Sequence, residues 1–134
     1  MATSHTVYLG DLRTENEHIQ SGQKIISDAP VDNQGKGAAF SPTDLVATAL
    51  SDCMMTIMGI KARDKNLDLR GTTIETTKIM VSDPRRIGEV IVEFTFPKNN
   101  FSEKDKTIFE AVTKTCPVVL SLHPDIKQTV KFNW

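Results

Sequence analysis

The two cysteines, Cys53 and Cys116, are the residues of this 134-residue chain best suited to chemistry. A thiolate is a strong nucleophile, but an ordinary thiol with a pKa of about 8.5 is only about 3% ionised at pH 7. A reactive cysteine therefore needs a cation or a helix dipole beside it. By local sequence Cys116 has the better position, because Pro117 can open a helix directly after it, whereas Cys53 lies well inside a predicted helix.

Other interpretations of the two cysteines stay open at this point. Both are candidates for small buried hydrophobic side chains, because free cysteine is among the most buried residue types. A structural disulfide between them would close a loop of about 64 residues and stabilise the fold by about 4 kcal/mol. A zinc site or a cysteine–histidine hydrolase is less well supported, because the chain's histidines show no paired-ligand spacing; they are His5, His18 and His123.

The longest predicted element is a helix over residues 41–63, which carries the first cysteine. Ser41 is a good N-cap, Pro42 suits the first helical position, and Asp44 stands where a capping box places its acidic residue. Residues 53–60 are apolar almost all round. This pattern predicts a central helix that is enclosed on every side or lies in an interface.

Shorter elements are predicted on both sides of this helix from alternating apolar residues and turn residues. The expected strands cover residues 6–9, 13–18, 23–27, 72–81, 88–97 and 127–133, and further helices cover residues 102–115 and 117–122. A polar loop at residues 31–37 is the one soft boundary. The order of elements predicts a single α+β domain over residues 1–134: an N-terminal β-meander, a long central helix, a β-hairpin, a second helix and a C-terminal strand, with the helices packed on antiparallel sheet.

Charge and composition exclude several classes of partner. Sixteen basic and 17 acidic residues give a net charge of −1, and no basic run exceeds two residues, so a nucleic-acid-binding surface is not expected. The N-terminus lacks a secretion signal and no apolar tract reaches the length of a membrane span. We therefore expect no membrane partner and a cytoplasmic location, where the cysteines would be thiols or a transient redox pair.

Two segments carry a family resemblance. Residues 40–53, FSPTDLVATALSDC, resemble the central-helix signature of the OsmC/Ohr family of osmotically induced and organic-hydroperoxide-resistance proteins. Residues 116–118, CPV, with residues 121–124, SLHP, are similar to the second-cysteine motif of that family. The resemblance covers nearly the whole chain. It implies an OsmC-like α+β fold that forms an intertwined homodimer with two active sites at the subunit boundary, and thiol peroxidase chemistry without a metal, flavin or haem.

The resemblance also implies roles for single residues. Cys53 resembles the peroxidatic cysteine and Cys116 the resolving cysteine, the reverse of what the dipole argument favours. Arg13, the only arginine before the central helix, is the candidate for the family's catalytic arginine. The carboxylate with which the family holds that arginine falls at Thr43 here. Asp44, one position later, is the candidate substitute, although its side chain points about 100° further round the helix and it already has a capping role.

The function expected from this resemblance is a peroxiredoxin-like hydroperoxide reductase. Organic hydroperoxides would be reduced to alcohols through a Cys53 sulfenic acid and a Cys53–Cys116 disulfide, which an external dithiol, such as a lipoyl-type reductant, reopens. Met54, Ile57 and Met58 would give the thiol an apolar surrounding that suits an organic substrate, unless they are simply core residues.

The alternative function is a non-catalytic OsmC-like dimer that binds a small ligand and has an impaired site. The missing carboxylate at Thr43 motivates this alternative. In that case Arg13 is an ordinary solvated strand residue beside Glu15. Exposure of the reduced protein to a hydroperoxide separates the two functions, because only the peroxidase forms a disulfide.

Overall fold

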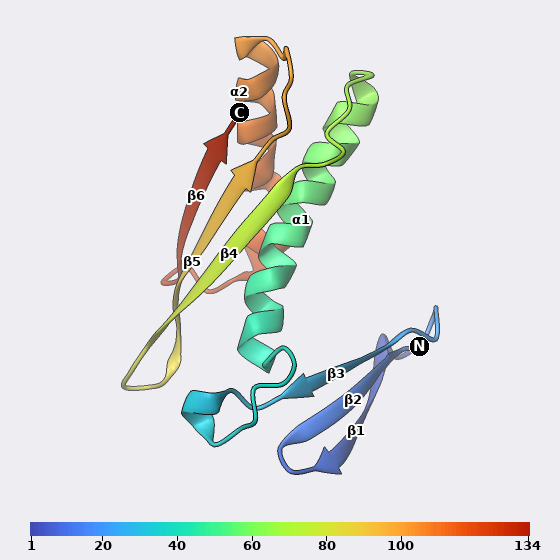
Figure 1. Ribbon diagram of the computed structural model, residues 1–134, viewed down its shortest axis with the longest axis vertical. Helices are drawn as coiled ribbons and strands as arrows, with labels where there is room; N and C mark the ends of the chain where they lie inside the picture. Colours follow the sequence, from blue (N-terminus) through green and yellow to red (C-terminus); the bar gives the residue numbers. More distant parts are fainter. The chain divides into compact units, whose positions relative to one another are not determined.

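The structure, a computed structural model, describes residues 1–134 throughout. The chain forms two compact units, Met1–Val46 and Ala47–Trp134 (Figure 1). The boundary lies within the first long helix rather than at the polar loop of residues 31–37, which instead contains a short 3-10 turn, η1 (Val31–Asn33).

The first unit is built on a three-stranded antiparallel meander, as predicted. Its strands are β1 (Ser4–Gly10), β2 (Arg13–His18) and β3 (Lys24–Asp28), in the order β1-β2-β3. The buried residues of this unit are all polar: Ser27, Asp28 and Ser41. Its large apolar side chains are exposed, among them Val7, Tyr8, Leu9, Leu12, Ile25, Ile26 and Phe40. This unit therefore has no apolar core of its own.

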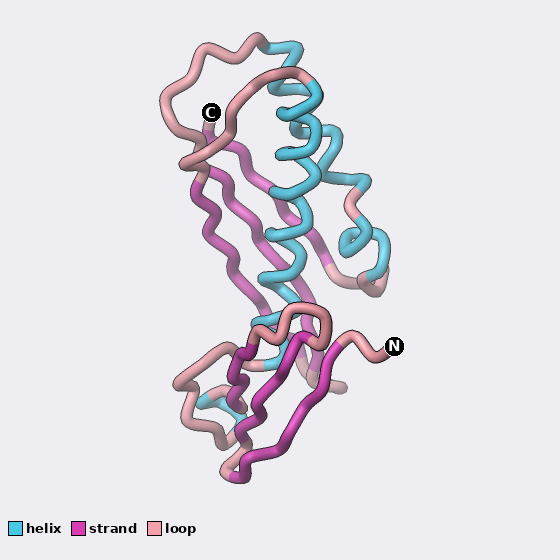
Figure 2. The backbone as a smooth tube through the Cα atoms, turned by 90° about the vertical axis from the view of Figure 1, so that its right-hand side faces the viewer, coloured by secondary structure: helices cyan, strands magenta, loops and turns pink.

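The second unit is a sheet covered by helices. The long helix α1 (Pro42–Asp64) enters it from the first unit. The remaining elements are β4 (Thr73–Val81), β5 (Arg86–Thr95), α2 (Glu103–Val112), the 3-10 turn η2 (Thr113–Thr115), α3 (Pro117–Ser121) and β6 (Lys127–Asn133). The strand order is β4-β5-β6. Figures 1 and 2 show α1 and α2 on the same face of this sheet.

The last strand corrects the predicted sheet. β4 and β5 form the expected antiparallel hairpin, but β6 pairs with β5 in parallel, with Val92 opposite Val130. The prediction of an entirely antiparallel sheet is therefore wrong. The helices α2 and α3 between β5 and β6 form a crossover connection, which returns the chain to the same end of the sheet, and a strand that starts there must run parallel to β5.

The core of the second unit lies between α1 and the helix-facing side of the sheet. On β5, Val90, Val92 and Phe94 are fully buried. The side of α1 that meets them repeats at helical spacing and consists of Ala47, Leu50, Ser51, Met54, Met58 and Ala62. Ile60, on another side of the helix, is 59% exposed. Within one chain, α1 is therefore covered on one side only. Of the two predicted alternatives, one chain does not enclose the helix on every side, and a position in an interface stays a prediction.

Helix α1 is also long and apolar enough to span a membrane by length and composition alone. Its most apolar window of 18 residues has a mean hydropathy of 1.4, and 33% of that window is buried inside the protein. The prediction concerned an uninterrupted apolar tract, and α1 is interrupted by Asp44, Ser51 and Asp52, so the expectation of no membrane partner stays a prediction. The core helix of a soluble protein meets the same criterion, and the buried stripe of α1 is a core stripe.

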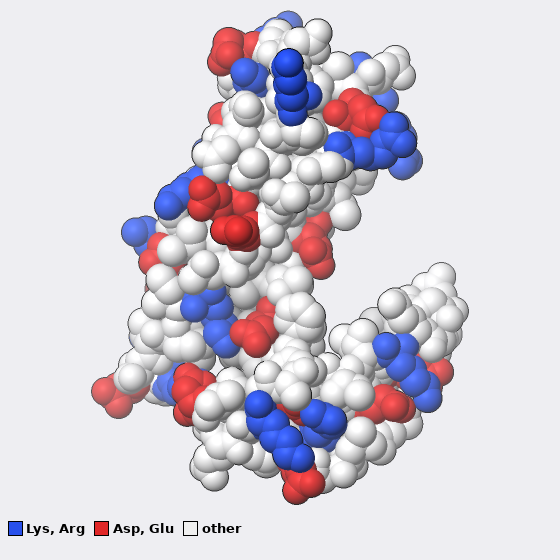
Figure 3. All heavy atoms as spheres, in the orientation of Figure 1, with Lys and Arg blue, Asp and Glu red and all other residues white.

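Charged side chains are interspersed on the surface. On the face drawn in Figure 3, acidic and basic groups of the Ala47–Trp134 unit alternate without forming a continuous basic band. This distribution matches the near-zero net charge of the sequence.

Candidate active site

The second unit brings the two cysteines together, although they lie far apart in the sequence. Cys53 is half-buried on α1, and Cys116 is fully buried at the N-cap of α3. Both are free thiols, and Cys53 packs against the core cluster that contains Cys116, close enough to raise the pKa of Cys116. A partly accessible thiol thus lies near a buried one. This is the arrangement in which a product formed on the first sulfur can be attacked by the second.

The surroundings of Cys116 favour the protonated thiol. Its pKa is raised, first because the group is buried and further because it lies beside the Cys53 side chain. Backbone N–H groups of Val118 and Val119 act in the opposite direction, and the Val119 N–H donates to Cys116 Sγ at 3.4 Å. The helix α3 has only five residues, and the pKa of Cys116 is raised and not lowered as the dipole argument predicts.

The surroundings of Cys53 are apolar and belong to the core. Met54 and Met58 are 2% and 0% exposed, and Ile57 packs against the same cluster. These three residues are thus core side chains, the simpler of the two predicted roles. Cys53 packs against this cluster while remaining partly accessible, and its backbone carbonyl accepts a hydrogen bond from Thr56 Oγ1 at 3.1 Å.

Arg13, in the first unit, is held by Asp28. The guanidinium donates from Nε to Oδ1 at 2.7 Å and from Nη2 to Oδ2 at 2.9 Å. Asp28 is 2% exposed and also accepts the Ala38 N–H at 3.1 Å. The hydrogen bond with Arg13 is the main reason why the pKa of Asp28 is lowered, and it raises the pKa of Arg13. A carboxylate from β3 therefore holds this arginine.

Asp28 was missed by sequence reasoning, although a signal for it exists. Arg13 and Asp28 are directly opposite each other in the β2–β3 register, where opposite charges on neighbouring strands pair. Arg13 pairs with Asp28, and the carboxylate of Glu15 pairs with Lys24 Nζ at 3.3 Å.

Ser41 and Asp44 form the predicted capping box at the start of α1. The Ser41 N–H donates to Asp44 Oδ2 at 2.9 Å, and the Asp44 N–H donates to Ser41 Oγ at 3.1 Å. Thr43 Oγ1 lies 3.3 Å from Ser41 Oγ in the same turn. The structural role of Asp44 is thus confirmed, and its catalytic role stays a prediction.

The histidine of the second-cysteine motif lies at the surface. The side chain of His123 is 68% exposed, and its Nδ1 accepts the Asp125 N–H at 3.0 Å. Across the chain, no three His, Cys, Asp or Glu side chains gather where they could hold a metal ion.

Comparison with known protein families decides what the chain is. The family model described as OsmC-like protein matches residues 35–131, which is most of the chain and includes both cysteines. The protein belongs to the OsmC-like family. This confirms the family predicted from the two cysteine motifs.

Solved structures agree with this assignment. The OsmC-like chain is 56% identical, with a TM-score of 0.95, to a Psychrobacter arcticus protein provisionally described as an osmotic stress induced and detoxification response protein; the match covers 99% of this chain and 96% of that one. The fold is shared with two more distant proteins. One is an organic hydroperoxide resistance protein OsmC from Legionella pneumophila, with 14% identity, a TM-score of 0.76 and coverage of 100% and 98% of the two chains. The other is an organic hydroperoxide resistance protein from Elizabethkingia anophelis, with 14% identity, a TM-score of 0.74 and coverage of 99% and 96%.

No curated protein matches this OsmC-like chain by sequence. The groups of this chain that offer chemistry are two neighbouring free thiols and an arginine held by a buried carboxylate.

Proposed function

We propose that this protein is a thiol-dependent peroxidase that reduces organic hydroperoxides. The observation that carries this proposal is the proximity of two free thiols, one partly accessible on α1 and the other buried at the start of α3. The fold that the chain shares with organic hydroperoxide resistance proteins supports the same chemistry. No metal, flavin or haem takes part in the proposed reaction.

The reaction begins at Cys53, whose thiolate sulfur attacks the terminal oxygen of the hydroperoxide. The S–O bond forms as the O–O bond breaks, and the leaving alkoxide takes a proton to become an alcohol. Cys53 is then a sulfenic acid. The sulfur of Cys116 attacks the Cys53 sulfur, a disulfide forms, and water leaves with the Cys116 proton. An external dithiol reduces this disulfide and is itself oxidised to a disulfide, which restores both thiols.

Arg13 supplies the positive charge in this proposal. A bidentate pair with Asp28 uses Nε and one N–H of Nη2, which leaves the donors of Nη1 for the Cys53 thiolate and the peroxide. A guanidinium held in one orientation stabilises developing negative charge without reorganising during the reaction. Asp28 is the positioning residue for Arg13, and we assign Asp44 to the helix cap.

We further propose that the protein acts as a homodimer in the cytoplasm. The Met1–Val46 unit has no apolar core, and α1 leaves Ile60 exposed, so each chain presents apolar surface that a second copy would cover. A cytoplasmic setting would keep both cysteines as thiols and would supply the dithiol reductant.

Steady-state turnover tests the proposed function. We expect the reduced protein to consume cumene hydroperoxide in the presence of dithiothreitol, and Cys53→Ser to abolish this activity. The matched variant Cys116→Ser keeps the first thiol and should still react with hydroperoxide once per chain. A Cys53→Ser variant as active as the wild type would overturn the assignment, and a folded wild type that consumes no hydroperoxide would favour the ligand-binding alternative.

A further inference from the structure

We propose that the second unit contains a separate binding site for an organic anion with an apolar chain. The site is an open cavity of about 500 Å³ bounded by α1, α2, η2, α3 and β6. This volume lies within the range of about 300–1,000 Å³ typical of small-molecule sites. Neither cysteine lines the cavity, so the site is separate from the thiol pair, although it adjoins Cys116 through Val119, whose N–H donates to Cys116 Sγ.

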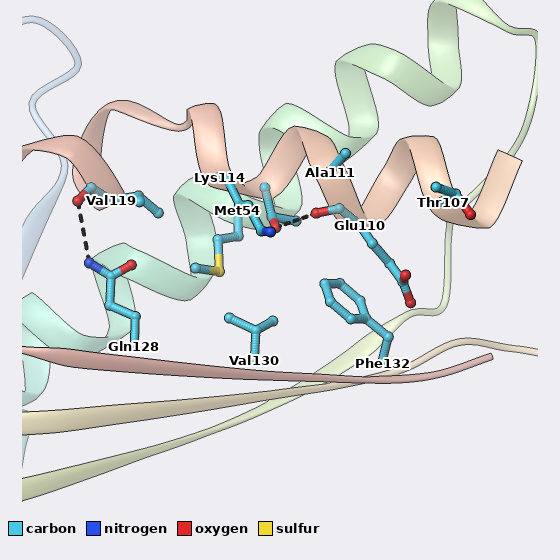
Figure 4. Close-up of a pocket in the computed structure, with 10 residues that line it drawn as sticks. Met54, Thr107, Glu110, Ala111, Lys114, Val119, Gln128, Val130 and Phe132 are labelled. Atoms are coloured by element: carbon cyan, nitrogen blue, oxygen red, sulfur yellow. Dashed lines mark hydrogen bonds between the residues drawn. The ribbon is translucent and has the colours of Figure 1, made fainter. Parts of the chain in front are cut away.

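The floor of the cavity is apolar. Figure 4 shows the side chains of Met54, Val130 and Phe132 in the space between α2 and β6. Met54 is almost fully buried, and the other two are half-buried, so they present an accessible apolar surface to the cavity. An alkyl chain placed there would remove this surface from water, which stabilises binding by up to about fourfold for each methylene buried.

The rim of the cavity supplies one uncommitted cation. Lys114 is exposed, lines the cavity, and forms no ion pair with the chain's own carboxylates. The neighbouring Glu110 accepts the Trp134 indole N–H through Oε1 at 3.1 Å. Lys114 is the one basic side chain that lines the cavity and is therefore the group that would bind a ligand anion. The apolar floor beside it selects for a carboxylate with an alkyl chain over a small inorganic anion.

Trp134 provides a direct signal of occupancy. It is the only tryptophan of the chain, and it stacks on Phe132, whose side chain lines the cavity, with a centroid distance of 6.5 Å. Its indole N–H also donates a hydrogen bond to Glu110, which lies at the rim of the cavity. A ligand on the floor of the cavity should thus change the fluorescence of Trp134.

Titration with decanoate, and with decanol as the uncharged analogue of equal chain length, tests the site. We expect a saturable change in Trp134 fluorescence with decanoate, weaker binding of octanoate, and weaker binding of decanol. Lys114→Glu should weaken decanoate binding at least fivefold and leave decanol binding within twofold. The matched control Lys104→Glu changes a lysine of α2 that does not line the cavity and should leave both affinities within twofold.

Two further variants separate this site from the proposed active site. Ala111→Phe places a ring at the cavity and should weaken both ligands, because Ala111 lines it. The double variant Cys53→Ser/Cys116→Ser should bind decanoate as the wild type does, whether or not the protein is a peroxidase. The proposal is overturned if decanoate gives no saturable change, if Lys114→Glu binds it as tightly as the wild type, or if the double variant loses binding.

Discussion

The bidentate pair of Arg13 and Asp28 is the best-defined ionic contact of the chain. Asp28 is nearly inaccessible and also accepts a backbone N–H, so the carboxylate is fixed from two sides. A guanidinium held in this way has less freedom than one on a flexible side chain. The pair is therefore suited to holding the guanidinium in one orientation toward a reacting group, in addition to stabilising the end of a strand.

Replacement of Arg13 tests its role in the reaction. We expect Arg13→Gln to lower the rate of cumene hydroperoxide consumption by about tenfold to a hundredfold, because it removes the charge that stabilises the transition state. The matched control is Arg70→Gln, since Arg70 also pairs with an aspartate, Asp68, but on the surface. Initial rates at saturating dithiothreitol give the comparison. Equal rates for Arg13→Gln and the wild type would remove Arg13 from the mechanism.

The raised pKa of Cys116 predicts how reactivity and stability depend on pH. Because burial favours the neutral thiol, the Cys116 thiolate should form only above the ordinary pKa of a thiol. The thiol of the unfolded chain ionises at a lower pH than that of the folded chain. The stabilisation from this group is therefore complete below the unfolded pKa and is lost as the pH rises through the higher folded pKa. We expect iodoacetamide to modify Cys116 at pH 8 at least tenfold more slowly in the folded Cys53→Ser protein than in urea. Equal rates would show that the thiol is not protected.

At the scale of elements, sequence reasoning located most of the fold. The helix starting at Ser41, the meander and the strand at residues 127–133 all occur where caps, turns and alternation placed them. The direction of β6 was not predictable in the same way, because it depends on which strand it meets after the crossover. Asp28 was missed because its role depends on strand register, which links residues that are distant in sequence.

The capping box of α1 makes a prediction at this scale. Ser41→Ala removes the acceptor for the Asp44 N–H and should lower the free energy of unfolding by about 1 kcal/mol. Urea denaturation measures the change. Ser4→Ala, an exposed strand position, serves as the control and should stay within about 0.5 kcal/mol of the wild type. If the two variants are equally stable, the box contributes little to the start of the helix.

At the scale of the whole molecule, the distribution of apolar surface sets the expectation of a dimer. The second unit has a continuous core, whereas the first has only polar buried residues and a set of exposed apolar ones. An apolar surface of this kind marks an interaction site in a soluble protein. The exposed side of α1 enlarges this apolar surface.

Substitution at Ile60 tests this expectation. We expect the wild type to have twice the mass of one chain in size-exclusion chromatography with light scattering. Ile60→Lys, which places a charge on the uncovered side of α1, should shift the protein towards the mass of one chain. Glu103→Lys changes charge at an exposed site of α2 and should leave the mass unchanged. A wild type that has the mass of a single chain at micromolar concentration would contradict the dimer.

Mass spectrometry of the reduced protein after one equivalent of cumene hydroperoxide examines the thiol pair most directly. We expect the mass of the intact chain to fall by the mass of two hydrogens, and a peptide digest to contain a pair linked through Cys53 and Cys116. In the Cys116→Ser variant, a sulfenic acid should remain on Cys53. Two thiols that remain free after this treatment, or a sulfenic acid found on Cys116 in place of Cys53, would contradict the proposed peroxidase.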